Sequence, residues 1–216
     1  LSIAFNGEIF NYVELREELR AKGRRFRTAS DTEVILHLYA VMGEDCLSVL
    51  NGDFSFAIWD RRRQRMLLAR DRMGVRPLFY TTHAGTFYFA SEIKALLQVP
   101  GISAELDPVA LDQIFTLWAP IAPRTGFRGI HELEPAHLMI VEKGKTSIRP
   151  YWQLDYPDHD APPLFADERS AAEELRALLT DATRIRMRAD VTVGSYLSGG
   201  LDSSIVSALA AGMAPQ

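Results

Sequence analysis

Residues 198–204 carry the strongest chemical signal, because they combine two glycines with serine and aspartate side chains in the order Ser-Gly-Gly-Leu-Asp-Ser-Ser. Adjacent glycines let the backbone turn tightly and bring its N–H groups close to a ligand. A helix that begins here adds unpaired N–H donors and the positive end of its dipole. The serine hydroxyls add donors, and Asp202 can hold a cation. The pattern predicts a phosphate-binding loop, against the alternative of a plain strand-to-helix turn with serine caps.

The other polar clusters indicate less chemistry. The phosphate loop lacks a Gly-Lys-Ser/Thr ending, so lysine-assisted γ-phosphate chemistry is not what it encodes. The five histidines are scattered without the spacing of zinc ligands, and we expect no structural metal. The basic residues between Arg61 and Arg65 have no interleaved aromatic residues, which favours a solvated turn over a nucleic-acid contact. The single cysteine, Cys46, is expected to be a buried structural thiol.

The elements around the phosphate loop follow from hydrophobic periodicity. An amphipathic helix is predicted over 171–188, an apolar strand over 191–197 and a helix of small residues over 203–211, which is the start of an α/β domain. Before them, residues 155–168 contain five acids and three prolines but no lysine or arginine, a composition typical of an exposed connector. We therefore predict domains at 1–154 and 169–216, joined by a linker at 155–168.

The first domain shows mixed α and β signals. An apolar run at 1–5 predicts a strand, and capping boxes at Asn11 and at Ser30 to Glu33 predict helices that end at Gly23 and Gly43. Four short segments rich in aromatic and branched residues predict an antiparallel meander over 54–90. The remaining predicted elements are helices at 92–97 and 107–118 and strands at 138–142 and 147–152.

Composition limits the functional classes. With 47% hydrophobic and 24% charged residues the chain suits a globular protein with a real core, which excludes disorder and coiled coil. The net charge of −4 provides no global attraction to nucleic acid or an anionic membrane. No run approaches the roughly 18 to 20 apolar residues of a membrane span, and the first residues lack the basic region and apolar stretch of a signal peptide. We expect a cytoplasmic protein and, because the chain starts with Leu1 inside a strand, an excerpt of a longer one.

The loop at 198–204 resembles the pyrophosphate loop of the ATP pyrophosphatase superfamily, which includes asparagine, argininosuccinate and GMP synthetases. The upstream residues resemble the glutaminase domain of glutamine-hydrolysing asparagine synthetases, in matching order and nearly end to end. The joint occurrence of both sets is more specific than either alone. The upstream motifs are Asn6–Asn11, Ser30–Glu33, Gly52–Phe56, Arg70–Gly74, Arg76–Tyr80 and Phe89–Glu92.

This resemblance implies an α+β glutaminase domain of the N-terminal nucleophile type, an incomplete αββα sandwich, followed by the start of an ATP pyrophosphatase-type domain. It implies that Asn6 and the N–H of Gly7 form an oxyanion hole, and that Glu8 and Asp31 hold the α-ammonium group of glutamine. An amide and a glycine N–H are neutral donors that suit a developing alkoxide, and a carboxylate suits an ammonium group. Alone, Asn-Gly would indicate a tight turn, and Asp31 a favourable charge at a helix start.

In the second domain the resemblance implies that Leu197 lies against the nucleotide of ATP. Pyrophosphate and its Mg²⁺ would be held by Ser198, Gly199, Gly200, Asp202, Ser203 and Ser204. The implied substrates are glutamine, aspartate and ATP, the implied product is asparagine, and a homodimer is compatible with the family. Nucleic-acid and membrane partners are not expected.

The sequence leaves two alternatives open. One is a related enzyme with another acceptor, such as a β-lactam synthetase-like cyclase whose first domain has lost its nucleophile. The other is a non-catalytic scaffold, which would have no need of an intact phosphate loop. The family's nucleophile is a cysteine at position one, and none lies there, so we expect that cysteine and the arginine that binds the glutamine carboxylate upstream of these residues.

These 216 residues alone are therefore predicted to be inactive in both half-reactions. A glutaminase assay and an ATP–pyrophosphate exchange assay on the isolated chain would check this. Turnover above background in either assay would contradict the prediction.

Overall fold

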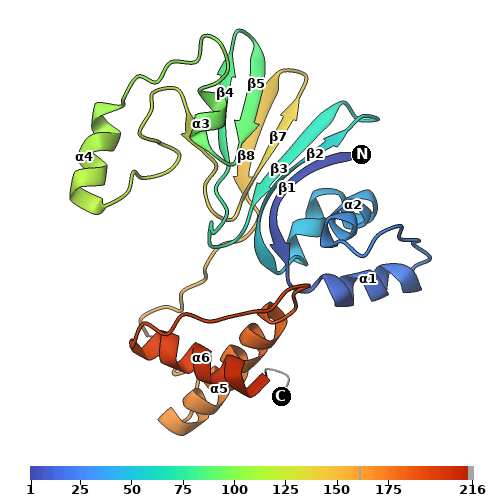
Figure 1. Ribbon diagram of the computed structural model, residues 1–216, viewed down its shortest axis with the longest axis vertical. Helices are drawn as coiled ribbons and strands as arrows, with labels where there is room; N and C mark the ends of the chain where they lie inside the picture. The colour runs from blue at the N-terminus through green and yellow to red at the C-terminus, as the bar shows by residue number, and fades with distance from the viewer. Residues whose placement is uncertain (161, 214–216) are drawn as a thin grey trace. The chain divides into compact units, whose positions relative to one another are not determined.

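The computed structural model describes residues 1–160 and 162–213, which divide into two compact units, Leu1–Leu154 and Asp155–Gln216 (Figure 1). The first unit contains two β-sheets with helices packed against them. The second contains two helices and the segments that connect them. None of the described helices is long and apolar enough to span a membrane.

A five-stranded antiparallel sheet is the centre of the first unit. Its strand order is β1-β2-β3-β7-β8, so β1 and β8 are the two edges. In the register of the first pair, Gly7 lies opposite Phe54 and Glu8 opposite Asp53. The strands are β1 (Ser2–Ile9), β2 (Gly52–Asp60), β3 (Arg65–Arg70), β7 (His137–Glu142) and β8 (Lys145–Pro150).

The second sheet has three strands in the order β5-β4-β6. These are β4 (Phe79–His83), β5 (Thr86–Ala90) and β6 (His131–Glu132). The prediction of a single meander over 54–90 is therefore wrong, although each predicted strand exists. Strand β3 pairs on its second side with β7, which lies much later in the chain, and not with β4. Residues 71–78 connect β3 to β4 in the other sheet.

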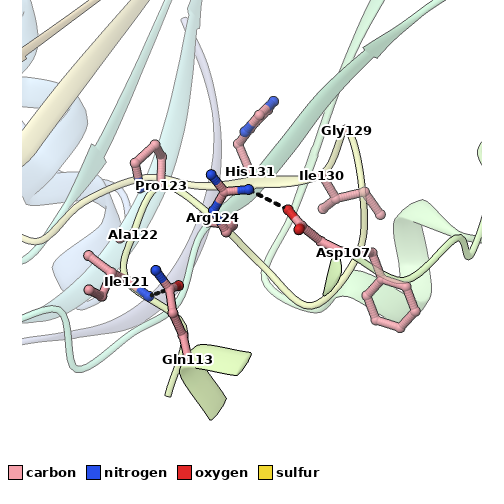
Figure 2. A pocket seen from close by; sticks show the side chains of 10 residues that line it. Asp107, Gln113, Ile121, Ala122, Pro123, Arg124, Gly129, Ile130 and His131 are labelled. Atoms are coloured by element: carbon pink, nitrogen blue, oxygen red, sulfur yellow. Dashed lines mark hydrogen bonds and ion pairs between the residues drawn. The ribbon is translucent and has the colours of Figure 1, made fainter. Parts of the chain in front are cut away.

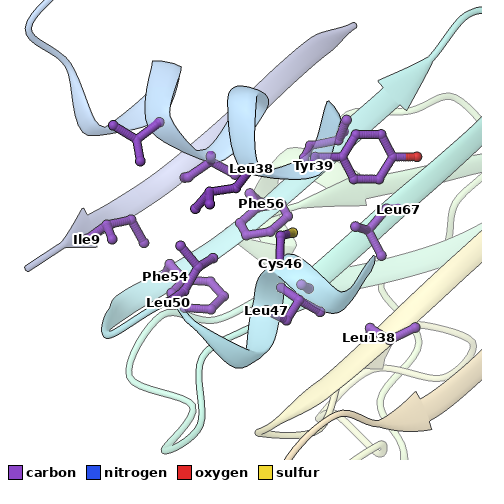
Figure 3. Packing of buried hydrophobic residues seen from close by; sticks show 14 of the residues in the cluster. Ile9, Leu38, Tyr39, Cys46, Leu47, Leu50, Phe54, Phe56, Leu67 and Leu138 are labelled. Atoms are coloured by element: carbon purple, nitrogen blue, oxygen red, sulfur yellow. The ribbon is translucent and has the colours of Figure 1, made fainter. Parts of the chain in front are cut away.

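Helices α1 (Tyr12–Ala21) and α2 (Asp31–Met42) cover one face of the five-stranded sheet, together with the short 3-10 helix η1 (Gly43–Ser48). Alternate residues of β2 point into this core, Phe54 and Phe56 (Figure 3) and also Ile58. The intervening residue Ala57 points to the other face, where Leu68 and Met139 meet side chains of the three-stranded sheet. The unit therefore has a helix layer and two sheet layers.

Two further helices belong to the three-stranded side of the unit. Helix α3 (Ile93–Leu96) packs against β4 and β5, and α4 (Pro108–Leu117) follows it along the chain. The predicted start of α4 is confirmed, because the Asp107 carboxylate accepts the N–H groups of Val109 and Ala110. Pro108 occupies the first helical position, where its missing N–H costs nothing.

Both predicted capping boxes form differently from the sequence expectation. Asn11 does not cap α1, because its side chain donates to the Val49 carbonyl and accepts from the Asn51 N–H. Ser30 does cap α2 through the Thr32 N–H, but the Glu33 carboxylate accepts from the backbone of Arg27 and Thr28 instead of Ser30. In each case a tertiary contact replaces a local one.

The second unit consists of α5 (Glu168–Arg186), capped by Asp167, and α6 (Leu201–Met213). The strand predicted over 191–197 is not formed, since no described segment pairs with these residues. A strand needs a hydrogen-bonded neighbour, and apolar composition alone does not supply one. The helices α5 and α6 on either side of this segment occur where the sequence predicts helices.

Arg70 and Asp71 organise the crossing between the two sheets. The Asp71 carboxylate is buried and accepts hydrogen bonds from the N–H groups of Phe54, Met73, Val75 and Arg76. The buried Arg70 guanidinium donates to three backbone carbonyls and pairs with Glu132 at 2.8 Å. These contacts shape residues 71–78 and bind them to β2 at Phe54, near its start.

Replacing Asp71 by alanine is expected to destabilise the first unit by about 3 kcal/mol or more, because several buried N–H groups lose their acceptor. Urea unfolding followed by tryptophan fluorescence measures this, since Trp59, Trp118 and Trp152 all belong to that unit. Asp112→Ala, on the exposed side of α4, is the matched control and should change stability by less than about 0.5 kcal/mol. A loss below about 1 kcal/mol for Asp71→Ala would contradict this role.

Candidate functional site

Strand β1 presents backbone groups at an open sheet edge. Ile9 donates its N–H to Asp31, whereas Phe10 donates to Asn51 on the β2 side. Because residues two apart in a strand direct their N–H groups to the same edge, the Gly7 N–H points away from β2. The bonds of Phe54, which lies opposite Gly7, are consistent with this direction. Its N–H and carbonyl form hydrogen bonds with Asp71, and so neither is paired with Gly7. The Gly7 N–H is therefore directed to the open edge.

Gly7 cannot be replaced by a residue with a side chain without moving a strand. Its φ is +145°, and a Cβ atom would lie 2.1 Å from the Asp53 carbonyl oxygen. Gly52 is equally restricted, because a Cβ there would lie 2.2 Å from the Glu8 carbonyl oxygen. The two glycines let the end of β1 approach the start of β2 closely.

Asn6 and Glu8 belong to the face of β1 opposite Phe5 and Ile9. Phe5 and Ile9 pack in the core beneath the helices, and side chains alternate along a strand. Asn6 is half-buried opposite Ser55, and Glu8 is exposed opposite Asp53. The predicted oxyanion residues thus lie at the end of β1 next to the predicted ammonium-binding Glu8.

Asp31 is brought to this same end of the strand from the start of α2. Its Oδ2 atom accepts the Ile9 N–H at 3.0 Å, a contact between residues 22 positions apart in sequence. Its Oδ1 atom accepts the Ser30 and Thr32 hydroxyls at 3.3 Å. The structure therefore brings Asp31 to Ile9, the residue directly after Asn6, Gly7 and Glu8, although Asp31 lies more than 20 residues further along the sequence.

The phosphate-loop residues form a second, separate group in the other unit. Gly199 has φ +83°, and the Ser203 and Ser204 hydroxyls donate to the Gly200 carbonyl at 3.1 and 2.8 Å. The Ser198 and Ser203 hydroxyls lie 2.9 Å apart. Leu197 and Asp202 are exposed, and Asp202 is in the first turn of α6. The loop is a compact turn at the helix start with its polar groups at the surface.

A cavity of about 360 Å³ lies elsewhere, beside α4 and residues 121–131 (Figure 2). Its charged side chains pair with each other, Arg124 with Asp107 at 2.6 Å, and the Gln113 carbonyl accepts the Ile121 N–H at 3.0 Å. The ion pair lowers the pKa of Asp107. None of the predicted site residues lines this cavity, and we assign it no chemistry.

Sequence reasoning missed the residues that hold the site in place. Asn11 joins the start of α1 to residues 49–51. Asp71 forms hydrogen bonds with the N–H and the carbonyl of Phe54, the residue opposite Gly7 in the sheet. The sequence signal is that Asn11 and Asp71 belong to the motifs Asn6–Asn11 and Arg70–Gly74, which does not specify their partners. Three of the four N–H donors to Asp71 come from the folded loop 73–76 and the fourth from Phe54 in β2, and these pairings are not visible in the sequence.

Comparison with known proteins identifies the family. A family model for the glutamine amidotransferase domain matches residues 1–152, and one for asparagine synthase matches residues 174–216. The chain belongs to the glutamine amidotransferase domain family and carries the start of an asparagine synthase domain.

Its relatives include asparagine synthetase [glutamine-hydrolyzing] 3 of Bacillus subtilis, which is 45% identical over 98% of this chain and 34% of its own length. A putative asparagine synthetase of Methanocaldococcus jannaschii is 39% identical over 94% of this chain and 39% of its own length. The amidase chyE of Penicillium rubens is 38% identical over 98% of the chain and 31% of its own length. The chain thus spans about a third of the length of these curated relatives.

Among solved structures, glutamine phosphoribosylpyrophosphate amidotransferase of Bacillus subtilis is similar, with a TM-score of 0.50 and 21% identity over 97% of this chain and 44% of that one. At this identity the likeness shows the fold alone. The predicted fold class, an N-terminal-nucleophile glutaminase fold followed by the start of an asparagine synthase domain, is confirmed.

Cys46 is not a candidate nucleophile. It is fully buried in the core beneath α2 (Figure 3), and burial raises its pKa to about 12. The reactive species of cysteine is the thiolate, which this environment excludes near neutral pH. The expectation of a buried structural thiol is confirmed.

Iodoacetamide at pH 8 is accordingly expected to leave Cys46 unmodified in the folded chain and to alkylate it in 8 M urea. Intact-protein mass spectrometry of the 216-residue chain, which has no other cysteine, measures this directly. Alkylation at equal rates in both solutions would show that the core around Cys46 opens readily.

Proposed function

We propose that the end of β1 and the start of α2 form the glutamine site of a glutamine-dependent amidotransferase. The observation that carries the proposal is the 3.0 Å hydrogen bond from the Ile9 N–H to Asp31, which holds a carboxylate at the residue that follows Asn6, Gly7 and Glu8. Asp31 and the backbone at Glu8 would bind the α-ammonium group of glutamine. A carboxylate is the natural partner of that charge, and Oδ2, which accepts the Ile9 N–H, has a second lone pair for it.

The Gly7 N–H and the Asn6 amide would stabilise the oxyanion formed when a cysteine thiolate attacks the glutamine amide. The direction of the Gly7 N–H, toward the open edge of β1, supports this role. Such a donor lowers the barrier by about 2.7 to 4 kcal/mol in a preorganised site. The proposal requires a cysteine nucleophile outside these 216 residues, because Cys46 is buried. Attack would release ammonia, and water would then release glutamate.

The second unit would begin the site that uses this ammonia. Leu197 would contact the nucleotide of ATP, and the N–H groups and hydroxyls of residues 198–204 would bind its phosphates. Asp202, exposed in the first turn of α6, fits a role near the Mg²⁺ that accompanies ATP and neutralises phosphate charge. ATP would adenylate the side-chain carboxylate of aspartate with release of pyrophosphate, and ammonia would displace AMP to give asparagine.

The match to a fungal amidase favours keeping a second candidate, in which the same pair of sites serves a different acceptor. A β-lactam synthetase-like cyclase is an extreme case, with an internal amine in place of ammonia. The retained Asn6-Gly7 pair and Asp31 favour glutamine use over that alternative. A scaffold without catalysis is opposed by the intact phosphate loop, and a test of ATP binding would decide that case.

The first experiment is to determine the N-terminal residue of the mature full-length protein by intact-protein mass spectrometry. A cysteine at position one would support glutamine-dependent amidation. Any other residue would leave the oxyanion donors without a nucleophile and favour a cyclase or an ammonia-dependent synthetase.

In the full-length protein, Asn6→Ala is expected to lower kcat/KM for glutamine-dependent synthesis by about 10² to 10³, through loss of an oxyanion donor. Synthesis from ammonium chloride should be unchanged, because it bypasses the glutaminase site. Initial rates with each nitrogen source measure both quantities. Equal losses with glutamine and ammonium chloride, or no loss with glutamine, would refute the assignment of Asn6.

A further inference from the structure

The connection between α1 and α2 runs along the surface, and few contacts define its path. Of residues 22–30 only Phe26 is partly buried. This segment ends at Ser30, directly before Asp31, so its conformation determines where α2 begins. A connection without a core of its own needs side chains from outside to hold it.

Arg16, in the middle of α1, supplies such a contact. Its Nη2 atom donates to the Ala29 carbonyl and, at 3.0 Å, to the Ser30 carbonyl. Its guanidinium carbon lies 5.0 Å from the ring centre of Tyr12 and 5.6 Å from that of Phe26. The planar group is therefore held between two aromatic rings while it binds the residues just before Asp31.

Glu33 fixes the other side of the same segment. Its carboxylate accepts the N–H groups of Arg27 and Thr28 and the Thr28 hydroxyl at 2.7 to 3.1 Å. The hydrogen bond from the Thr28 side chain lowers the pKa of Glu33 to about 2, so Glu33 is ionised throughout the neutral range. Residues 27 and 28 are thus tied to α2, and residues 29 and 30 are tied to α1.

Together with earlier contacts, these hydrogen bonds form a closed series that connects α1, α2, β1 and β2 around the proposed ammonium site. Asn11 ties the start of α1 to residues 49–51, Arg16 ties α1 to Ser30, and Asp31 ties α2 to the Ile9 N–H. Ile9 lies opposite Gly52 in the sheet, next to residues 49–51 that Asn11 contacts, and so the series of contacts is closed. Removal of the Arg16 contact leaves the Ala29 and Ser30 carbonyls, just before Asp31, without their donor on α1.

We propose that Arg16 is a positioning residue for glutamine binding, which holds the Ala29–Ser30 backbone so that the Asp31 carboxylate faces the α-ammonium group. This inference rests on the proposed function, because it takes glutamine as the ligand of Asp31. Arg16 contacts the carbonyls of the two residues before Asp31 and acts only through that backbone.

Arg20 provides a matched control on the same helix. It also lies over Phe26, at 5.8 Å, but its guanidinium pairs with the exposed Glu17 and makes no recorded bond to the Ala29 or Ser30 carbonyl among the described residues. Arg16→Gln and Arg20→Gln remove the same charge from the same surface. Only the first removes the two carbonyl contacts.

The test measures glutamine hydrolysis by the full-length protein with two substrates, glutamine and the monoamide of glutaric acid, which lacks the α-amino group. Arg16→Gln is expected to raise KM for glutamine about tenfold with kcat within about twofold. Its kcat/KM for the monoamide should be unchanged, because this substrate has no ammonium group for Asp31. Arg20→Gln should behave as the parent enzyme with both substrates.

Asp31→Asn separates failure of this inference from failure of the proposed function. If Asp31→Asn leaves KM for glutamine unchanged, the proposed ammonium site is wrong. If it raises KM but Arg16→Gln does not, or if Arg16→Gln impairs both substrates equally, only the positioning role is overturned. The double variant should lose no more than Asp31→Asn alone, since both act on one interaction.

Should Arg16→Gln fail to fold, Arg16→Lys supplies the same test. Its ammonium group can donate to one carbonyl but lacks the planar group that stacks between the rings. An intermediate rise in KM for glutamine alone is expected, and a parent-like KM would overturn the role of the guanidinium.

Discussion

The ladder between β1 and β2 determines which backbone groups of β1 remain available for chemistry. Every second N–H of β1 is used by β2, and the others point to the edge. At Gly7 and Gly52 the strands approach so closely that any side chain would collide with a carbonyl oxygen. The register therefore determines which N–H groups point away from β2 at the end of β1. The Gly7 N–H is one of them, and the next one, that of Ile9, donates to Asp31.

The position of β2 depends on buried polar groups on the side of β2 that faces away from β1. Asp71 binds the N–H and carbonyl of Phe54 through its own carboxylate and N–H, so the position of β2 opposite Gly7 is fixed by an ionic group within the protein. Burying a carboxylate is costly unless its hydrogen bonds are satisfied, and Asp71 has four donors. The crossing between the sheets therefore serves both to connect layers and to keep β2 in place.

The sequence predicts local structure well and tertiary pairing poorly. The start of α4 at Asp107-Pro108 and the burial of Cys46 follow from residue types alone. The separation of β3 from β4 does not, because the residues of neither strand specify its partner, and β3 pairs with the distant β7. Asn11 and Glu33 show the same limit, since their side chains could satisfy either a local cap or a distant backbone group. The segment 191–197 has the composition of a strand but no described partner.

The two edges of the five-stranded sheet differ in how they resist unwanted pairing. Strand β8 carries Lys145, Arg149 and Pro150, and such residues discourage another chain from adding to an edge. Strand β1 has neither lysine, arginine nor proline, and both Ala4 and the preceding Leu1 are exposed. Self-association of these 216 residues in solution would therefore begin at β1, and a peptide that covers this edge would be the natural means to suppress aggregation.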